Sequence, residues 1–167
     1  MKMTIKLNSK ENIDRLTQLT QKTNQFNLTT RRYDQQQMLQ FIASDDWTVA
    51  SFSITDIFGS SGIVGLMLSR HLDSSQVEID SFLMSCRVIG RQAETAFLKF
   101  ILEYLASNNV TNVVADYLPT KKNKLVSSFY ENHGFKLEEN GRYRIDILGR
   151  QLDEIPFPPI EIIHETE

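Results

Sequence analysis

Cysteine is nearly absent from this chain: among 167 residues there is one, Cys86, and there are only three histidines. A single cysteine cannot form an internal disulfide, so the packing of a core has to hold the fold together. The histidines, at positions 71, 133 and 164, have no metal-ligand spacing with each other or with the cysteine. The sequence therefore predicts neither a disulfide framework nor a metal site.

Long apolar runs and strong net charge are also missing. No stretch approaches the ~20 apolar residues of a membrane helix, and residues 1–6 alternate in polarity instead of building a signal-peptide core. A net charge of −3 argues against nucleic-acid binding through general electrostatics. With 41% hydrophobic residues, the chain can bury one core. We expect a cytoplasmic protein that binds neither membrane nor nucleic acid.

The first half of the chain has the pattern of two helices followed by a meander of strands. Apolar residues at helical spacing after residue 12 indicate a first helix, which Asn8 or Ser9 would cap. Asp34 and Gln37 form a capping-box pattern for a second helix over residues 38–43. Alternating apolar residues predict strands at residues 47–55, 63–70 and 76–85.

The second half predicts a helix, a strand, a short helix and a hairpin. The helix is expected at residues 91–107 and the strand at residues 110–117. The short helix would end at Gly134, a suitable C-cap, and the hairpin would pair residues 135–139 with 142–147 through a turn at Asn140 and Gly141. The single domain would span residues 1–148. The tail at 149–167 contains three prolines and is expected either to wrap the surface or to be disordered.

The strand at 76–85 carries candidate acid–base groups. A strict period of two would place Val77, Ile79 and Leu83 on one face and Glu78, Asp80, Phe82 and Met84 on the other. Glu78 and Asp80 would then lie about 7 Å apart on the same face, where either carboxylate can serve as a base. A pair of solvated charges on an open sheet face is the alternative.

A basic turn joins this strand to the long helix. The turn, Cys86-Arg87-Val88-Ile89-Gly90-Arg91-Gln92, leaves backbone N–H groups free at the positive end of the helix dipole. Arg87 and Arg91 add positive charge to the same place. The pattern predicts a site for a diphosphate or a similar anion, with an ordinary turn bearing two solvated arginines as the alternative.

Two more residues near the strand ends are candidates for chemistry. Cys86 lies beside the basic turn, where positive surroundings favour a thiolate that accepts an acyl group as a thioester; the alternative is a small packing residue. Asp116 lies near the end of the strand at 110–117. It would either hydrogen-bond hydroxyls of the acyl group or cap the loop before Pro119.

The order of elements resembles that of the GNAT superfamily of acyltransferases over residues 28–146. Arg87, Gly90 and Arg91 match its pyrophosphate motif, although Gln92 stands where a small residue is usual. Asn123 and the segment 128–135, Ser-Phe-Tyr-Glu-Asn-His-Gly-Phe, resemble a second motif of the family. The resemblance implies an α/β (α+β) fold with a central mixed, mostly antiparallel sheet flanked by helices.

The same resemblance implies a binding site for coenzyme A or for the phosphopantetheine of a carrier protein. Its arm would lie in the opening between the strands that end near Ser85 and Tyr117, with Asn123 contacting it and Tyr130 facing the thiolate as general acid. The full set of implied cofactor-binding residues is Phe82, Met84, Arg87, Val88, Ile89, Gly90, Arg91, Gln92 and Asn123.

A closer resemblance is to the C-terminal domain of the FkbH-like glyceryltransferase/phosphatase proteins of polyketide pathways. It rests on residues 19–33 (LTQKTNQFNLTTRRY), 80–91 (DSFLMSCRVIGR) and 117–120 with Lys122 and Asn123. Such proteins carry a haloacid-dehalogenase-type domain, take a glyceryl group from 1,3-bisphosphoglycerate and hand it to an acyl carrier protein. This chain has no Asp-x-Asp-x-Thr motif, so we expect it to work with such a domain, in cis or in trans, and not as a phosphatase.

The expected function is therefore acyl (glyceryl) transfer to, or positioning at, the phosphopantetheine thiol of an acyl carrier protein. Cys86, Tyr130, Asp80 and Asp116 are the expected catalytic residues; a core aromatic with a satisfied hydroxyl is the alternative for Tyr130. Asn24 to Asn27, Arg31 and Arg32 would form the acceptor or substrate rim, with a solvated connector as the alternative. A coenzyme A-dependent N-acetyltransferase and a non-catalytic domain that docks the carrier protein are the two alternatives.

Overall fold

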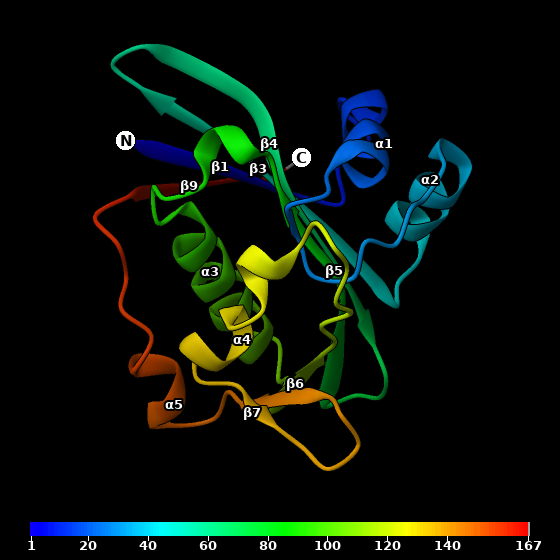
Figure 1. Ribbon diagram of the computed structural model, residues 1–167, viewed down its shortest axis with the longest axis vertical. Helices are drawn as coiled ribbons and strands as arrows, with labels where there is room; N and C mark the ends of the chain where they lie inside the picture. The colour runs from blue at the N-terminus through cyan, green and yellow to red at the C-terminus, as the bar shows by residue number, and fades with distance from the viewer. Residues whose placement is uncertain (167) are drawn as a thin grey trace.

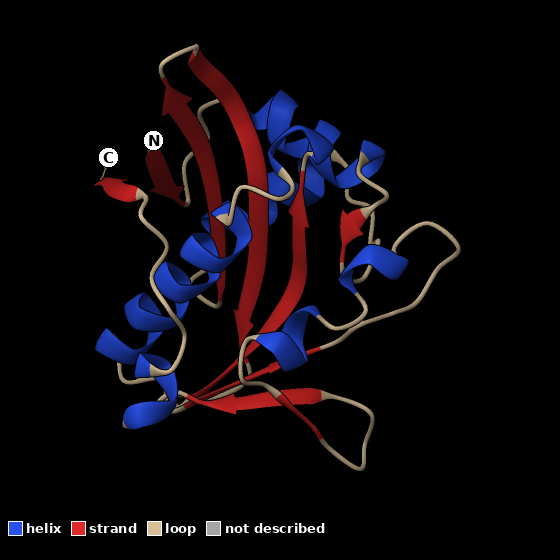
Figure 2. Ribbon diagram, turned by 60° about the vertical axis from the view of Figure 1, so that its left-hand side comes forward, coloured by secondary structure: helices blue, strands red, loops and turns tan. Residues whose placement is uncertain are grey.

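The computed structural model describes residues 1–166, apart from the side chain at position 150. Within these residues a nine-stranded mixed sheet has helices on both faces, which confirms the predicted α/β class (Figures 1 and 2). The strands are β1 (Lys2–Leu7), β2 (Phe26–Asn27), β3 (Trp47–Asp56), β4 (Gly59–His71), β5 (Gln76–Met84), β6 (Asn112–Ala115), β7 (Lys136–Leu137), β8 (Tyr143–Asp146) and β9 (Glu161–Glu165).

Five α-helices and two short 3-10 turns accompany the strands in the described part of the chain. They are α1 (Ile13–Lys22), α2 (Gln35–Ala43), η1 (Cys86–Val88), α3 (Ala93–Ser107), η2 (Lys124–Val126), α4 (Phe129–Asn132) and α5 (Arg150–Asp153). The predicted capping box of α2 is confirmed, because Asp34 and Gln37 exchange both side-chain to backbone hydrogen bonds. Helix α1 begins later than expected, after Asn12 and not after Asn8 or Ser9.

The sheet runs in the order β7-β8-β6-β5-β4-β3-β1-β9, with β2 added beside β5. Only β5 with β6 and β1 with β9 are parallel pairs; the other pairs are antiparallel. The β5–β6 pairing extends from Gln76 opposite Asn112 to Ile79 opposite Ala115 and then stops. Beyond Ile79 the two strands separate, and this opening is where the sequence places a pantetheine arm.

Each face of the sheet has its own apolar cluster. Helix α3 covers one face through a stripe of buried residues that includes Ala96, Phe97 and Ile101, and α4 and α5 lie on the same side. Helices α1 and α2 cover the other face through Leu16, Leu19 and Met38. The helices thus bury the apolar residues of the central strands on both faces and leave the ends of β5 and β6 for function.

Both ends of the chain belong to the fold. Residues 1–6, noted in the sequence only for their alternation, form β1, whose Met3 and Ile5 are fully buried. Residues 149–166 pack on the rest of the fold: β9 pairs with β1 (Figure 1), and Leu152, Ile155 and Ile160 are buried against the core. The apolar residues of this segment are spaced too irregularly to show a helical or strand period, which explains why the sequence did not predict their burial.

A β-bulge in β5 changes which side chains face which helix. Strand β4 pairs with Ser81 and then with Ile79, so Asp80 is an extra residue in β5. Before the bulge Ile79 faces α3, whereas after it Phe82 faces α3 and Leu83 faces α1 and α2. The predicted strict alternation along this strand is therefore wrong from Ser81 onward.

Candidate functional site

The chain itself fills the opening between β5 and β6. Strand β2 places Phe26 opposite Met84 and Asn27 opposite Leu83 on β5. The Leu28 N–H then donates to the Phe82 carbonyl at 3.1 Å, and the Leu28 carbonyl accepts from the Leu118 N–H at 2.9 Å. Figure 1 shows this connection after α1 running beside the chain that leads into α4. In this conformation residues 26–28 occupy the place expected for a pantetheine arm.

Asn123 locks these two segments together from a fully buried position. Its Nδ2 donates to the Asn27 and Leu118 carbonyls, each at 3.0 Å, and its Oδ1 accepts from the Thr120 N–H at 2.8 Å and from the Tyr117 hydroxyl at 3.4 Å. All four hydrogen-bonding positions of the amide are used. In this conformation Asn123 joins the two loops, and its expected contact with a pantetheine arm stays a prediction.

The expected catalytic carboxylates lie close together but are bound to arginines. Arg31 contacts Asp80 Oδ1 at 3.1 Å and Asp116 Oδ2 at 3.4 Å, and so bridges the two. Arg142 donates to Asp116 Oδ1 at 2.8 Å and to Glu78 Oε2 at 3.3 Å. These contacts make the carboxylates poor candidates for general bases in this conformation, because each already accepts charged hydrogen bonds.

Asp80 is the most buried member of this network and has further donors. The Tyr33 hydroxyl and the Ser81 hydroxyl both donate to its Oδ2 at 2.8 Å. Burial, followed by the hydrogen bond to Asp80, raises the pKa of Tyr33 well above its ordinary value, so the phenol keeps its proton and remains a donor. The bulge makes this arrangement possible by turning Asp80 and Ser81 to the same side.

Tyr130 differs from these groups because its hydroxyl has no partner. The side chain is 2% exposed, its ring packs on Phe135 and Tyr143, and within residues 1–166 the hydroxyl makes no hydrogen bond. Burial raises its pKa above the ordinary value, the charges of Asp116 and Asp80 raise it further, and Arg31 opposes them. Tyr130 is therefore a neutral phenol in the core, packed against Phe129, Phe135 and Tyr143.

The basic turn after β5 has free backbone donors. Within the described chain, the N–H groups of Gly90, Arg91 and Gln92 donate to no protein acceptor, and α3 begins directly after them. Gly90 has φ +84°, and the space around it is open. Arg87 stays free of carboxylates, whereas Arg91 pairs with Asp56 at 2.6 Å. Arg91 therefore contributes less positive field to the turn than expected.

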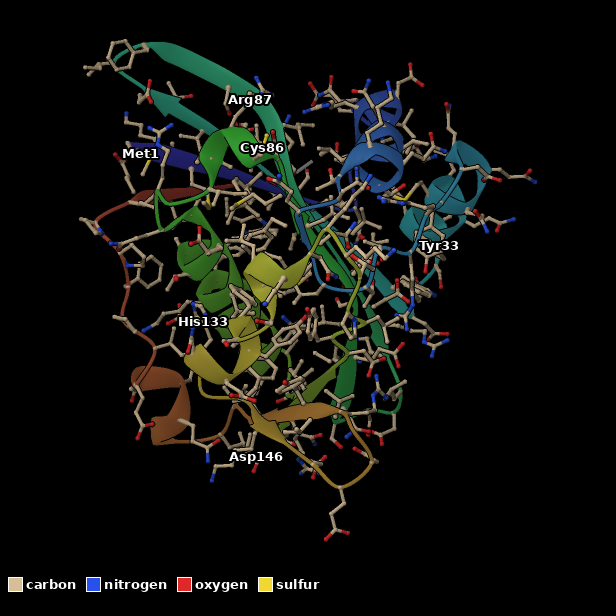
Figure 3. All side chains as sticks on the ribbon, viewed as in Figure 1. Met1, Tyr33, Cys86, Arg87, His133 and Asp146 are labelled. Carbon is tan, nitrogen blue, oxygen red and sulfur yellow. The ribbon has the colours of Figure 1, made fainter. Side chains whose placement is uncertain are left out.

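Cys86 is exposed and lines a hollow of about 330 Å³ between α1 and the end of β5. Figure 3 shows Cys86 and Arg87 next to each other on the segment that leads to α3. Arg15 and Lys22 line the same hollow, and no carboxylate does. The pKa of Arg15 is lowered, mainly by burial and further by repulsion from Arg87. The thiol thus faces a cationic hollow and is not the buried packing residue of the alternative interpretation.

The remaining residues expected to bind the cofactor differ in how far their side chains are buried. Phe82, Met84 and Val88 are buried in the core beneath α3, so their side chains serve packing and only their backbones face the opening or the turn. Ile89 packs partly against the same core. Arg87, Gly90 and Gln92 remain accessible at the turn. The structure therefore has one accessible turn with free N–H groups, one exposed thiol and one buried phenol.

Several site residues had no signal in the sequence. Arg142 follows a hairpin turn and reaches Asp116 and Glu78 only because β8 lies next to β6. Tyr33 reaches Asp80 across the connection from α1 to α2. Residues 1–166 bring no set of three metal-ligating side chains together, and no helix among them has the length and apolar character to cross a bilayer.

The comparisons with known proteins show the fold. Ard1 from Thermoplasma volcanium is similar at a TM-score of 0.66 with 16% identity, over 89% of this chain and 100% of that one. The GNAT domain of S. lividans PAT gives a TM-score of 0.64 with 16% identity, over 85% and 89%. Rv2747 from Mycobacterium tuberculosis, in complex with CoA, gives 0.57 with 17% identity, over 77% and 68%.

No protein-family model and no curated protein matches the sequence. At these identities the structural similarity establishes the fold of the GNAT acetyltransferases and leaves the reaction to be argued from the site. It confirms the predicted GNAT-like architecture, whereas the closer resemblance to FkbH-like proteins stays a prediction.

Proposed function

We propose that this domain acts in acyl transfer to the phosphopantetheine thiol of an acyl carrier protein, with glyceryl as the acyl group. The accessible turn at residues 90–92 carries the proposal, since its three free N–H groups and the neighbouring Arg87 suit a phosphate of the prosthetic arm. The likeness to GNAT structures, one of them in complex with CoA, supports a ligand of this chemical class.

Two groups would take part in the chemistry. The Cys86 thiol, exposed in a hollow with Arg15 and Lys22, would attack the acyl carbon of a donor thioester or acyl phosphate and release the donor's thiol or phosphate. The carrier thiol would then attack the Cys86 thioester and release the Cys86 thiol. Tyr130 is a neutral phenol beside the opening and would donate a proton to a departing thiolate. A haloacid-dehalogenase-type domain, in cis or in trans, would supply the glyceryl group.

A non-catalytic docking domain is the second candidate, and one observation favours it. Residues 26–28 fill the opening and hydrogen-bond to Phe82 and Leu118, so an arm can enter only if they move.

The N-acetyltransferase alternative requires a base for the amine, and Asp80, Asp116 and Glu78 are all paired with arginines. The carrier thiol needs no such strong base, since it ionises more readily than an alkylammonium group loses its proton.

The test is loading of a holo carrier protein, followed by mass spectrometry. The chain is combined with the haloacid-dehalogenase-type domain and 1,3-bisphosphoglycerate, and we expect a glyceryl adduct that moves from the Cys86 peptide to the carrier. Cys86→Ala should lose the enzyme adduct and the transfer while staying folded. Transfer at the normal rate in that variant would support docking instead, and turnover of acetyl-CoA on simple amines would support the N-acetyltransferase.

The turn has its own matched pair of variants. Gly90→Glu adds negative charge and bulk, and should abolish binding of coenzyme A and of holo carrier protein. Gly90→Ala carries the same backbone strain at φ +84° without the charge, and should bind nearly as well as the unmodified chain. Equal binding by Gly90→Glu would remove the turn from the site.

A further inference from the structure

A second hollow lies beside the filled opening, on the loops that Asn123 joins. Its volume is about 390 Å³, and six residues line it: Asn24, Thr30, Arg32, Thr120, Lys121 and Lys122. Three of them are cations and none is a carboxylate. It shares Asn24 with the Cys86 hollow, so the two hollows adjoin along the connection between α1 and α2.

The charge of this hollow is not neutralised by the protein. Arg31 is bound by Asp80 and Asp116, but its neighbour Arg32 donates only to uncharged oxygens, the Thr20 and Thr23 carbonyls at 2.6 Å and Asn24 Oδ1 at 2.5 Å. Within residues 1–166, the side chains of Lys121 and Lys122 form no ion pair. Three unpaired cations on one surface of a chain with net charge −3 make a local anion-binding field.

The walls of the hollow are fixed before any ligand arrives. The Thr120 hydroxyl oxygen accepts from the N–H groups of Lys122 and Asn123 at 3.2 Å, which leaves its proton free to donate. Asn123 ties this loop to Asn27 on the opposite wall. Thr30 has φ +52°, a left-handed conformation that costs energy for a β-branched residue. The backbone of the hollow therefore needs little rearrangement, and mainly the two lysine side chains have to order when an anion binds.

We propose that this hollow binds a phosphate group. Arg32 uses three of its five N–H donors on the Thr20, Thr23 and Asn24 oxygens, which leaves the Nε–H and one Nη2–H for a ligand. The two lysines present point charges from the other wall, so the cations approach an anion from two directions. The Thr120 hydroxyl adds a neutral donor. This site is separate from the turn at Gly90 and does not depend on the acyl-transfer proposal. Its phosphate belongs either to a small phosphorylated metabolite or to a prosthetic arm.

The test is titration of the full chain with inorganic phosphate, followed by amide NMR. Saturable shifts are expected at Thr30 and at residues 120–123. Lys121→Glu and Lys122→Glu should each weaken binding about tenfold or more, because each removes one charge-assisted contact and adds repulsion. Both side chains are exposed and unbonded, so the fold should be kept, which the unchanged remainder of the spectrum would confirm.

One control variant and one separate measurement distinguish this site from other effects. Lys10→Glu makes the same charge change at an exposed lysine outside the hollow and should leave phosphate affinity unchanged. The shifts at Thr30 and at residues 120–123 are followed separately from those at residues 90–92, which distinguishes binding in the hollow from binding at the turn. Absence of saturable shifts, or an unchanged affinity in Lys122→Glu, overturns the proposal.

The source of the phosphate follows from competition. If 3-phosphoglycerate displaces inorganic phosphate from the hollow and coenzyme A does not, the ligand is a small phosphorylated metabolite. If coenzyme A displaces it and dephospho-coenzyme A or 3-phosphoglycerate does not, the ligand is a nucleotide-linked arm. Displacement by holo but not by apo carrier protein assigns the phosphodiester of phosphopantetheine.

Discussion

At the scale of single residues, Tyr130 is where stability and the proposed chemistry make opposite demands. Its hydroxyl is buried without a hydrogen-bond partner within the described chain. Burying this group lowers the stability of the folded state, and a phenylalanine at the same position would avoid that cost. The neighbouring Tyr143 hydroxyl, by contrast, donates to Glu131 Oε1 at 3.3 Å. The general-acid role that we propose would need the proton of this hydroxyl, and the stability cost of the group is one that selection for function can retain.

Tyr130→Phe should therefore raise the free energy of unfolding by about 1 kcal/mol, because it removes an unsatisfied buried group. The same variant should lower the rate of acyl transfer roughly 100-fold, the usual contribution of a general acid. Urea denaturation and a transfer assay measure the two effects. Tyr143→Phe is the control, since it loses a hydrogen bond and should be slightly less stable with unchanged transfer. A destabilised Tyr130→Phe would mean that the hydroxyl is satisfied in solution.

At the scale of elements, local signals in the sequence predicted local structure. The capping box of α2 is confirmed, and so is the hairpin at Asn140 and Gly141, where Gly141 adopts φ +81° in the turn between β7 and β8. Both depend on residues within four positions of each other. Strand β2 pairs with the distant residues Met84 and Leu83, and its two-residue length leaves no periodicity to detect. The bulge at Asp80 depends on the register between β4 and β5, which the residues of β5 alone do not determine.

Asn123→Ala tests the interlocking of these elements. The change leaves the Asn27 and Leu118 carbonyls and the Thr120 N–H without partners, so the free energy of unfolding should fall by roughly 2–4 kcal/mol. Urea denaturation measures the loss. Asn108→Ala, which removes contacts at an exposed helix end, should cost much less. If Asn123→Ala kept its stability and lost only coenzyme A binding, the result would support the direct contact between Asn123 and the pantetheine arm that the resemblance implies.

At the scale of the whole molecule, the sheet carries two separate charge patterns. Three arginines and three carboxylates neutralise each other on β4, on β5, at the adjoining ends of β6 and β8, and on the connection before α2; they are Arg31, Arg70, Arg142, Glu78, Asp80 and Asp116. Within residues 1–166, Arg32, Lys121 and Lys122 form no ion pair and lie at the surface nearby. The sequence indicated the candidate carboxylates and the turn at Gly90, but not their arginine partners, because pairing across strands depends on tertiary register.

The buried phenols also predict how the whole molecule responds to alkali. Burial raises the pKa of Tyr33 and of Tyr130 above the ordinary value of 10.0. Above that pH the unfolded chain releases these protons while the folded chain keeps them. The folded state then binds more protons, so the free energy of unfolding falls with rising pH, by up to about 1.4 kcal/mol per pH unit for each tyrosine. Well below pH 10.0 both tyrosines are protonated in the folded and the unfolded chain, so they do not make the free energy of unfolding depend on pH.

Urea denaturation at a series of pH values up to about pH 11 measures this slope. The Tyr33→Phe/Tyr130→Phe double variant should lose most of it, since neither position can then titrate, and the lysines common to both proteins cancel in the comparison. Tyr33→Phe alone should lose part of the slope and also some stability near neutral pH, because Asp80 loses a hydrogen bond. An equally steep slope in the double variant would show that the two phenols are open to water in the folded protein, and Tyr130 would then no longer be a protected proton donor beside the opening.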